Sequence, residues 1–390
     1  MYDELPEEWV QLRDVVRRFT DEVIEPRAAE IEATNEVPAD ILRQAGELGL
    51  FGLSIPEQYG GFGESELASC VALETLSRGP GGVTFLIAPS APAAAIRFAG
   101  TEAQRSKFLP RLAKGEAFSA FCLSEATAGS DAAGIKTRAI RRNGKWVVNG
   151  SKLWISRASK AEIFLVSAVT DPDKRGAGGI TVFLGEKRPG IVVGKPDRQM
   201  GGRGSGSAEV SFQDCEFSDD EALGPGGAGS GVLKFILGRA RLWAAARAVG
   251  VQQRCMEVVL EHIDTREQFG KKLGDFQAVK MKLADMTADL YTSRLLLHRS
   301  AALFDLGRDP AQEVAIAKLF ATEAASRAAD AAIQLHGAMG VSQEFVVERL
   351  YRDSRAYRIL DGTSDIQRLM IASAVQRNGI GQAMAPGGIL

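Results

Sequence analysis

Residues 138–156 read RAIRRNGKWVVNGSKLWIS, and this stretch decides the fold class of the chain. It places β-branched and aromatic residues around two Asn-Gly pairs, and an Asn-Gly pair between such runs is the strongest short-range signal for a β-hairpin. Strand-like composition continues at residues 163–169, 179–184 and 208–212. The middle third of the chain is therefore predicted to be a β domain.

The regions on either side have the periodicity of helices. Apolar residues recur at helical spacing from Leu12 to Val23, and further helical stretches follow at residues 39–48, 64–76 and 101–112. After the Gly-rich residues 224–231, steps of three and four return, which is typical of a helix bundle, at Phe276, Val279, Leu283, Met286 and Leu290.

The order α, β, α predicts an α+β multidomain protein. We expect an N-terminal all-α domain at residues 1–117, a middle antiparallel β barrel or sandwich at 118–226, and a C-terminal four-helix bundle at 227–390. Residues 379–390 lack periodicity and are predicted to be a tail. A ligand is expected to bind in a cleft where the three domains meet.

Composition argues against several classes of protein. The 390 residues are 45% hydrophobic and carry a formal net charge of -2 without basic tracts, so we expect a chain folded throughout that binds no nucleic acid. Four isolated cysteines and three scattered histidines lack ligand spacing, so no metal site is expected. We find no secretory signal and no stretch of membrane-spanning length, which predicts a cytoplasmic protein.

Taken singly, the local motifs have ordinary structural interpretations. Residues 224–231 lack the residues of a P-loop, and no GxGxxG follows a strand, so they are interpreted as a linker and no nicotinamide site is expected. Residues 124–131, SEATAGSD, form a turn on this interpretation. Trp154 is a core aromatic by base rates, and Asp361 begins an Asp-Gly turn, with Thr363 or Ser364 capping the next helix.

In combination, these motifs resemble the acyl-CoA dehydrogenase family of FAD-dependent flavoenzymes. FCLSEATAGSD at residues 121–131 is similar to the flavin-contacting signature of that family, and KLWIS at 152–156 to its tryptophan segment. RAVG at 247–250 followed by TREQFGKKLGDFQAVKMKLADM at 265–286 is similar to its C-terminal signature. DAAIQLHGAMG at 330–340 and RDSRAYRILDGTSDIQRLMIA at 352–372 complete the series in the same order.

The resemblance implies that FAD binds between the β domain and the bundle, and that its adenosine end reaches a neighbouring subunit of a homotetramer. The positions on the flavin and ligand-phosphate side are matched by Phe121, Leu123, Ser124, Gly129, Ser130, Trp154 and Ser156. The adenine and pyrophosphate side is matched by Arg266, Gln268, Phe269, Phe276, Gln277, Gln334, His336 and Gly337. The remaining FAD contacts are matched by Thr363 and Asp365.

The resemblance also implies a reaction, the α,β-dehydrogenation of an acyl-CoA or acyl-carrier thioester to the 2-enoyl thioester. Asp361 matches the base that removes the α-proton, and the β-hydrogen leaves as hydride to flavin N5. Burial is expected to raise the pKa of Asp361 toward the working pH. Substrate positions are matched by Ser130, Gly238, Arg241, Leu360 and Gly362. The expected electron acceptor is an electron-transfer flavoprotein.

The chain departs from the family pattern around the base. Most members have Glu where this chain has Asp361, and the missing methylene withdraws the carboxylate by roughly 1 Å, a displacement that can cost about a hundredfold in rate. Ala240 stands where other branches carry the base, so no alternative carboxylate appears there. Changes at Gly238, Leu360 and Ala338 suggest a branched, cyclic or aryl-bearing acyl group.

Two other functions are compatible with the same fold. One is an oxidase or monooxygenase, because nitroalkane oxidase also uses an Asp base at the position of Asp361; rapid reaction of the reduced flavin with oxygen would select it. The other is a non-catalytic partner subunit or a nucleic-acid-associated relative. The retained carboxylate of Asp361 and the near-neutral charge count against this second function.

Overall fold

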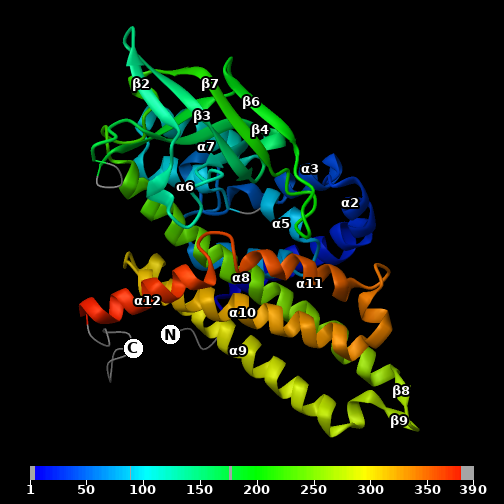
Figure 1. Cartoon of the computed structure of the whole chain (residues 1–390). Helices are drawn as coiled ribbons and strands as arrows, with labels where there is room; N and C mark the ends of the chain where they lie inside the picture. The colour runs from blue at the N-terminus through cyan, green and yellow to red at the C-terminus, as the bar shows by residue number, and fades with distance from the viewer. Residues whose placement is uncertain (1–4, 88, 175–177, 379–390) are drawn as a thin grey trace.

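The computed structural model describes residues 5–87, 89–174 and 178–378, and it has three regions in the predicted order (Figure 1). The predicted tail at residues 379–390 lies outside the described residues. The strands gather at one end of the molecule and the long helices of the bundle at the other, as Figure 1 shows. The loop between α11 and α12, which carries Asp361, lies where the bundle meets the rest of the protein.

The N-terminal region is helical. Its α-helices are α1 (Glu7–Phe19), α2 (Ala28–Thr34), α3 (Ala39–Glu47), α4 (Glu66–Leu76), α5 (Gly81–Ile87), α6 (Ala91–Ala99) and α7 (Glu102–Ala113). The predicted helices at 39–48, 64–76 and 101–112 are confirmed, and the starts of the last two are explained by caps. The Ser65 side chain accepts from the backbone N–H of Ala68, and Thr101 and Gln104 form a capping box.

The short helices α5 and α6 were not predicted, and they correct one expectation. Residues Gly81–Ala99 form a stretch of 19 residues with a mean hydropathy of 1.3, which is long and apolar enough to cross a membrane by length and composition. The expectation that no stretch reaches that length was therefore wrong. Most of this stretch is buried inside the protein, so core packing accounts for its hydropathy.

The middle region forms one sheet of seven strands. These are β1 (Phe118–Cys122), β2 (Arg138–Arg142), β3 (Lys145–Ile155), β4 (Ala161–Val169), β5 (Ile180–Glu186), β6 (Ile191–Pro196) and β7 (Ala208–Phe217). Their order is β1-β4-β2-β3-β7-β6, and β5 pairs with β4. Most pairs are antiparallel, but β1 and β2 each pair in parallel with β4. The intervening hairpin supplies the long connection that the parallel neighbours β1 and β4 need.

The two Asn-Gly pairs have different structures. Asn143 and Gly144 have φ values of 51° and 76° and join β2 to β3 as predicted. Asn149 and Gly150 do not form a turn, and that expectation was wrong, because they lie inside β3 where its register with β7 shifts. A Cβ atom on Gly150 would lie 2.4 Å from Oγ1 of Thr137, so the glycine permits a close approach of strands.

The C-terminal region is a bundle of long helices. It contains α8 (Gly229–Thr265), the hairpin β8 (Glu267–Gln268) and β9 (Lys271–Lys272), α9 (Gln277–Asp305), α10 (Ala311–His336), α11 (Val346–Tyr357) and α12 (Ser364–Asn378). The predicted linker at 224–231 extends too far, because α8 already begins at Gly229. Its middle is buried on all sides, since α4, α6, α9, α10 and α11 surround it.

The N-terminal helices connect the other two regions. Leu67, Cys70 and Val71 of α4 share a hydrophobic core with α8, α9 and α10. Residues of α6 and α7 share a second core with the sheet strands β4 and β5. A third core lies within the N-terminal helices, and a fourth within the sheet. The three regions therefore pack around common interiors, which fixes the position of the α11–α12 loop.

Candidate active site

Asp361 lies in the short loop between α11 and α12 in an unusual backbone conformation. Its φ is 55° and that of Gly362 is 100°, so two successive residues adopt left-handed or glycine-type conformations. Such strain persists only where the surroundings fix it, and it occurs most often at functional sites. Oγ1 of Thr363 accepts from the backbone N–H of Ile366 at 3.2 Å, so Thr363 caps α12 as predicted.

Side chains from three helices hold this loop by its carbonyl groups. Nε of Arg241 on α8 donates to the carbonyl of Asp361 at 3.1 Å. Nζ of Lys318 on α10 and Nε2 of Gln367 on α12 each donate to the carbonyl of Gly362 at 2.8 Å. A Cβ atom on Gly362 would lie 2.8 Å from Nε2 of Gln367, so only glycine fits there without displacing that donor.

The loop leaves two groups of Asp361 available. Among the residues that the structure describes, no hydrogen bond or ion pair ends on its carboxylate, and its N–H donates to no acceptor. Burial raises the pKa of the carboxyl group, as predicted, against the opposing attraction of Arg247, Lys318 and Arg241. An unpaired carboxylate with a raised pKa is what a general base requires.

The cations around Asp361 are also shifted. Burial lowers the pKa of Lys318 to about 8, with the attraction of Asp361 opposing and the repulsion of Arg241 adding to the shift. Burial likewise lowers the pKa of Arg241 and Arg247. Lys318, Gln367 and Arg247 were missed by sequence reasoning, because contacts between separate helices leave no local pattern in the sequence.

Trp154 projects from the β domain and is not a core aromatic. It lies in β3 at the register shift between Lys152 and Ile155, has a φ of 60°, and is 65% exposed. The base-rate interpretation of Trp154 was therefore wrong, because a β-bulge turns the side chain outward. A large aromatic residue in a left-handed conformation with an exposed ring points to a stacking surface.

The segment before Trp154 is fixed to the turn at residues 124–131 by a buried ion pair. Nζ of Lys152 lies 2.8 Å from Oε1 of Glu125 and 3.1 Å from the carbonyl of Leu123. Burial would raise the pKa of Glu125, but hydrogen bonds from Lys152 and Thr137 lower it overall. The N–H of Leu153 donates to the carbonyl of Ser124 at 2.9 Å. The segments 124–131 and 152–156 are therefore fixed to each other. Sequence reasoning also missed the Lys152–Glu125 ion pair that joins them.

The remaining predicted residues fall into separated groups. In the β domain Leu123 is buried, Phe121, Ser124 and Ser156 are half-buried, and Gly129 and Ser130 are exposed. Gly238 and Arg241 lie on α8, and Leu360 is half-buried beside Asp361. Arg266, Gln268 and Phe269 lie on the β8–β9 hairpin, at the end of the bundle remote from the sheet (Figure 1). One chain therefore does not bring all the predicted cofactor residues together.

Most of the predicted cofactor residues on the bundle are exposed, and aromatic contacts order some of them. Phe269 is 94% exposed, has a φ of 53°, and packs edge-on against Phe276, which precedes Gln277 at the start of α9. Gln334 and Gly337 are exposed at the end of α10, where His336 is buried and stacks on His262 with ring centroids 4.2 Å apart. Asp365 is exposed in the first turn of α12.

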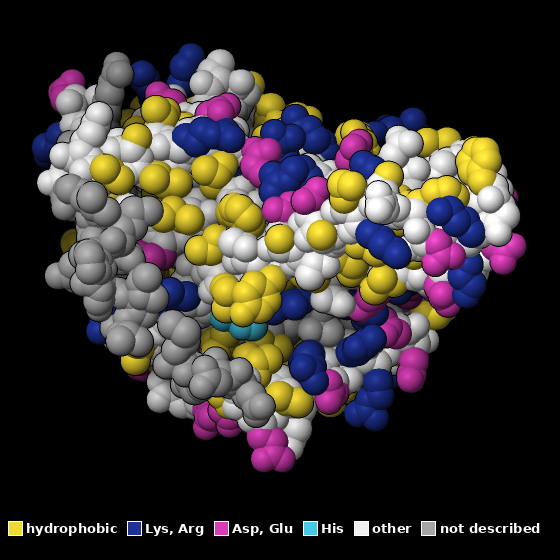
Figure 2. Space-filling model, turned by 90° about the horizontal axis from the view of Figure 1, so that it is seen from below, with side chains coloured by type: hydrophobic (Ala, Val, Ile, Leu, Met, Phe, Trp, Pro, Cys, Tyr) yellow, Lys and Arg dark blue, Asp and Glu magenta, His cyan; other side chains and the backbone are white. Residues whose placement is uncertain are grey.

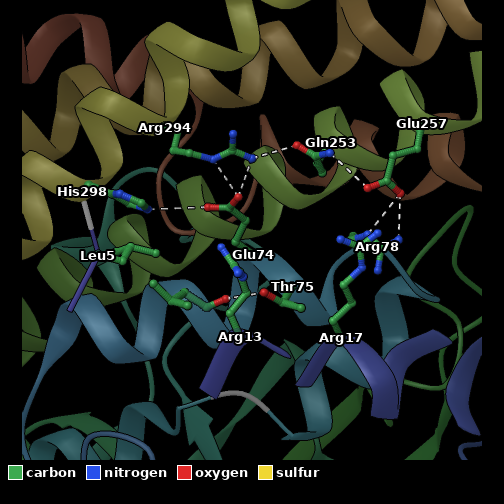
Figure 3. Close-up of a pocket in the computed structure, with 11 residues that line it drawn as sticks. Leu5, Arg13, Arg17, Glu74, Thr75, Arg78, Gln253, Glu257, Arg294 and His298 are labelled. Carbon is green, nitrogen blue, oxygen red and sulfur yellow. Dashed lines mark hydrogen bonds and ion pairs between the residues drawn. The ribbon is translucent and has the colours of Figure 1, made fainter. Parts of the chain in front are cut away.

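A separate charged cavity of about 370 Å³ lies between α1, α4, α8 and α9, and it contains none of the predicted site residues. Figure 3 shows the guanidinium groups of Arg294 and Arg78 directed at the carboxylates of Glu74 and Glu257. Gln253 connects the two pairs, accepting from Arg294 at 2.9 Å and donating to Glu257 at 3.0 Å. Each of the two carboxylates is therefore paired with an arginine, and Arg13 and Arg17 also line the cavity.

Comparison with known proteins supports the same family throughout the chain. Family models for the N-terminal, middle and C-terminal domains of acyl-CoA dehydrogenase match residues 6–116, 120–215 and 227–376. An acyl-CoA dehydrogenase of Bacillus subtilis is 37% identical over 369 residues, covering 94% of this chain and 97% of that protein.

Solved structures agree with these matches. The structure of butyryl-CoA dehydrogenase from Megasphaera elsdenii superposes with a TM-score of 0.93 at 32% identity, covering 97% of this chain and all of that one. The prolyl acyl carrier protein oxidase AnaB superposes with a TM-score of 0.90 at 29% identity, covering 95% of this chain and all of that one. The chain therefore belongs to the acyl-CoA dehydrogenase family and is an FAD-dependent oxidoreductase.

Proposed function

We propose that this protein converts an acyl-CoA thioester to the 2-enoyl-CoA, with Asp361 as the base. The observation that carries the proposal is the state of the Asp361 loop. Its carbonyls are bound by Arg241, Lys318 and Gln367, while its carboxylate forms no pair within the described residues. Because these three side chains bind backbone carbonyl groups of the loop, they position the carboxylate of Asp361 without forming hydrogen bonds to it.

Removal of an α-proton from a thioester needs two groups on the protein. The carboxylate of Asp361 accepts the proton, and a donor must face the carbonyl oxygen on which enolate charge develops. The N–H of Asp361 has no acceptor among the described residues, so it is available for that oxygen. Gly362 and Leu360 would border the thioester, and Arg241, Gly238 and Ser130 the rest of the ligand.

FAD fits the exposed features of the β domain. The ring of Trp154, together with Phe121, Leu123, Ser124, Gly129, Ser130 and Ser156, would hold the flavin, with Thr363 and Asp365 completing the contacts from α12. When bound, FAD supplies the acceptor for the hydride that leaves the β-carbon. The Lys152–Glu125 pair keeps the two β-domain segments of this set in register.

The exposed groups on the bundle favour a second copy of the chain. Met281, Tyr291 and Leu295 of α9 are each more than half exposed. Figure 2 shows the molecule from below, and on this lower face hydrophobic side chains gather among charged ones. A face of this kind is typical of a subunit interface.

In such an assembly the β8–β9 hairpin would reach the FAD of a neighbouring subunit through Arg266, Gln268, Phe269 and Phe276, joined by Gln277, Gln334, His336 and Gly337. We extend the proposal to a cytoplasmic homotetramer. An electron-transfer flavoprotein would reoxidise the enzyme.

An oxidase or monooxygenase is the second candidate, because AnaB is an oxidase of the same fold and Asp361 is shorter than the usual base. The two functions differ in the fate of the reduced flavin. A non-catalytic subunit is disfavoured, since it would not need a strained loop with an unpaired carboxylate.

Anaerobic titration of the yellow holoenzyme with a panel of straight, branched, cyclic and aromatic acyl-CoAs tests the proposal. At least one acyl-CoA is expected to bleach the flavin absorbance, and admission of oxygen is expected to restore the colour only slowly. Fast reoxidation by oxygen would select the oxidase or monooxygenase. If none of the thioesters reduces the flavin, dehydrogenation of acyl-CoA is excluded.

The pH dependence of kcat/KM is expected to have two limbs. The acid limb reports Asp361, because the protonated acid cannot accept a proton; burial raises its pKa, so the limb lies at higher pH than for an ordinary aspartate. The alkaline limb reports Lys318, whose pKa is about 8, because deprotonation weakens its bond to Gly362. In Lys318→Met the alkaline limb should disappear and the acid limb should move to higher pH. An unchanged profile in that variant would contradict both assignments.

A further inference from the structure

The charged cavity between α1, α4, α8 and α9 shares no residue with the Asp361 site. Its volume of about 370 Å³ lies within the range of roughly 300–1,000 Å³ that small-molecule sites occupy. None of the residues that line it belongs to the motifs that resemble the family signatures, and none is a predicted cofactor or substrate residue. The proposed dehydrogenation therefore leaves this cavity without a role.

Both carboxylates of the cavity are saturated by donors. Oε1 of Glu74 accepts from Nε and Nη2 of Arg294 at 2.8 and 2.6 Å. Oε2 of Glu257 accepts from Nε and Nη2 of Arg78 at 3.2 and 2.7 Å, and its Oε1 accepts from Gln253 at 3.0 Å. Burial would raise the pKa of each carboxyl group, but hydrogen bonds lower it overall, so both acids stay ionised. A cation that entered the cavity would have to compete with guanidinium groups already in place.

The arginines of the cavity, in contrast, have donors to spare. Arg13 and Arg17 lie one turn apart on α1, and their side chains rise from that helix toward the other residues of the cavity (Figure 3). Among the described residues Arg13 bonds to its neighbour Asp14 alone, and Arg17 forms no hydrogen bond, with its Nε 3.6 Å from Asp21. Neither aspartate lines the cavity. Four arginines and two glutamates therefore line it, and the glutamates are paired with the other two arginines.

The four arginines also differ in how firmly they are held. The Arg78 side chain is 6% exposed and bonds to Asp21 as well as Glu257, and that of Arg294 is about one-third exposed. The side chains of Arg13 and Arg17 are 45% and 58% exposed. These two can turn toward a ligand without breaking a buried ion pair. The cavity thus combines a fixed interior with two adaptable donors at its outer edge.

We propose that this cavity binds a small phosphate monoester, with Arg13 and Arg17 donating to the phosphate group. The terminal oxygens of a phosphate group can accept from several guanidinium groups in different directions, whereas the two oxygens of a carboxylate lie in one plane. The cavity has room for more than a phosphate ion, and Leu5 and Val71 line it beside the charged groups, so an organic portion fits there too. A bound ester would connect α1 to the bundle helices α8 and α9.

Calorimetry on the FAD-loaded enzyme tests this site. The probes are glycerol 3-phosphate, AMP and inorganic phosphate, with succinate as a dianion that has no phosphate, all titrated at one ionic strength. At least one of the two esters is expected to saturate at one molecule per chain and to bind more than about tenfold more tightly than succinate. Its binding should persist when CoA is present in excess, because the cavity shares no residue with the proposed thioester site.

Variants locate the binding. Arg13→Gln/Arg17→Gln should weaken binding of the ester by more than about tenfold, since hydrogen bonds from charged donors are lost. Arg43→Gln is the matched control, because Arg43 also pairs with an acid four residues later, Glu47, and does not line the cavity. It should bind the ester like the wild type. The double variant should keep the wild-type Tm without ligand, since both side chains are well exposed.

Four results would overturn the inference. Neither ester may bind in a saturable way, or succinate may bind as tightly as the esters, which would mean that the cavity attracts charge without recognising phosphate. An undiminished affinity in Arg13→Gln/Arg17→Gln would place the ester elsewhere. Displacement of the ester by CoA would place it in the proposed thioester site. Because none of these measurements uses flavin reduction, the inference stands or fails separately from the proposed dehydrogenation.

Discussion

Asp361→Asn is expected to retain FAD and to lose flavin reduction by substrate by a factor of about a hundred to ten thousand, the range that a positioned general base contributes. Asparagine has nearly the same shape and keeps the backbone bonds that Arg241 and Lys318 make to the loop. It cannot accept the α-proton, however. The rate is measured by anaerobic stopped flow at the flavin absorbance maximum.

A second substitution at the same position provides the control. Asp361→Glu keeps the carboxylate and adds the methylene that most members of the family have, so flavin reduction should persist. The visible spectrum of each variant reports whether FAD is bound. Undiminished reduction in Asp361→Asn would remove Asp361 from the chemistry, and the reaction would then need another base.

Lys152→Met is expected to have the largest effect on stability. The Lys152 side chain is fully buried and its ammonium lies 2.8 Å from Glu125, whose side chain is 7% exposed. Removal of one partner of a buried ion pair leaves the other charge uncompensated, which costs about 3–5 kcal/mol. The same change loosens the segments around Ser124 and Trp154, so FAD affinity should fall as well. Denaturant unfolding of the apoprotein and FAD titration measure the two effects.

The same strand offers a matched control. Lys145 also lies on β3 and pairs with Glu216 at 2.6 Å, but both side chains are more than half exposed. Lys145→Met should therefore cost less than about 1 kcal/mol. The double variant Lys152→Met/Glu125→Gln should recover part of the loss, because no unpaired charge remains. Equal effects of Lys152→Met and Lys145→Met would show that the buried pair has no special role.

Much of the architecture could be predicted from local sequence patterns. The hairpin at Asn143–Gly144, the helices that begin at Ser65 and Thr101, and the cap at Thr363 all depend on residues that are neighbours in the chain. Local patterns also explain why Asn149–Gly150 was misinterpreted as a turn. The dipeptide is identical to Asn143–Gly144, but it lies inside β3, where pairing with β7 gives it a different structure.

In the candidate site, too, the sequence predicted the residues of continuous motifs but not the contacts between remote segments. Asp361, Gly362 and Trp154 were recognised because each lies in a motif that is continuous in sequence. The sequence could not show that Trp154 is exposed, since a register shift with β7 decides its direction. It also could not show the Lys152–Glu125 pair, whose members are 27 residues apart.

The sequence by itself determined the order of the domains and the family, and it pointed to Asp361 as the proposed base, because periodicity, turn residues and motifs are properties of short segments. Only the tertiary structure decided what surrounds the base. Arg241 and Arg247 of α8 and Lys318 of α10 act on the carboxylate of Asp361 only after those helices pack against its loop. Burial and pairing of charges depend on distances between remote segments, and these are fixed when the chain folds.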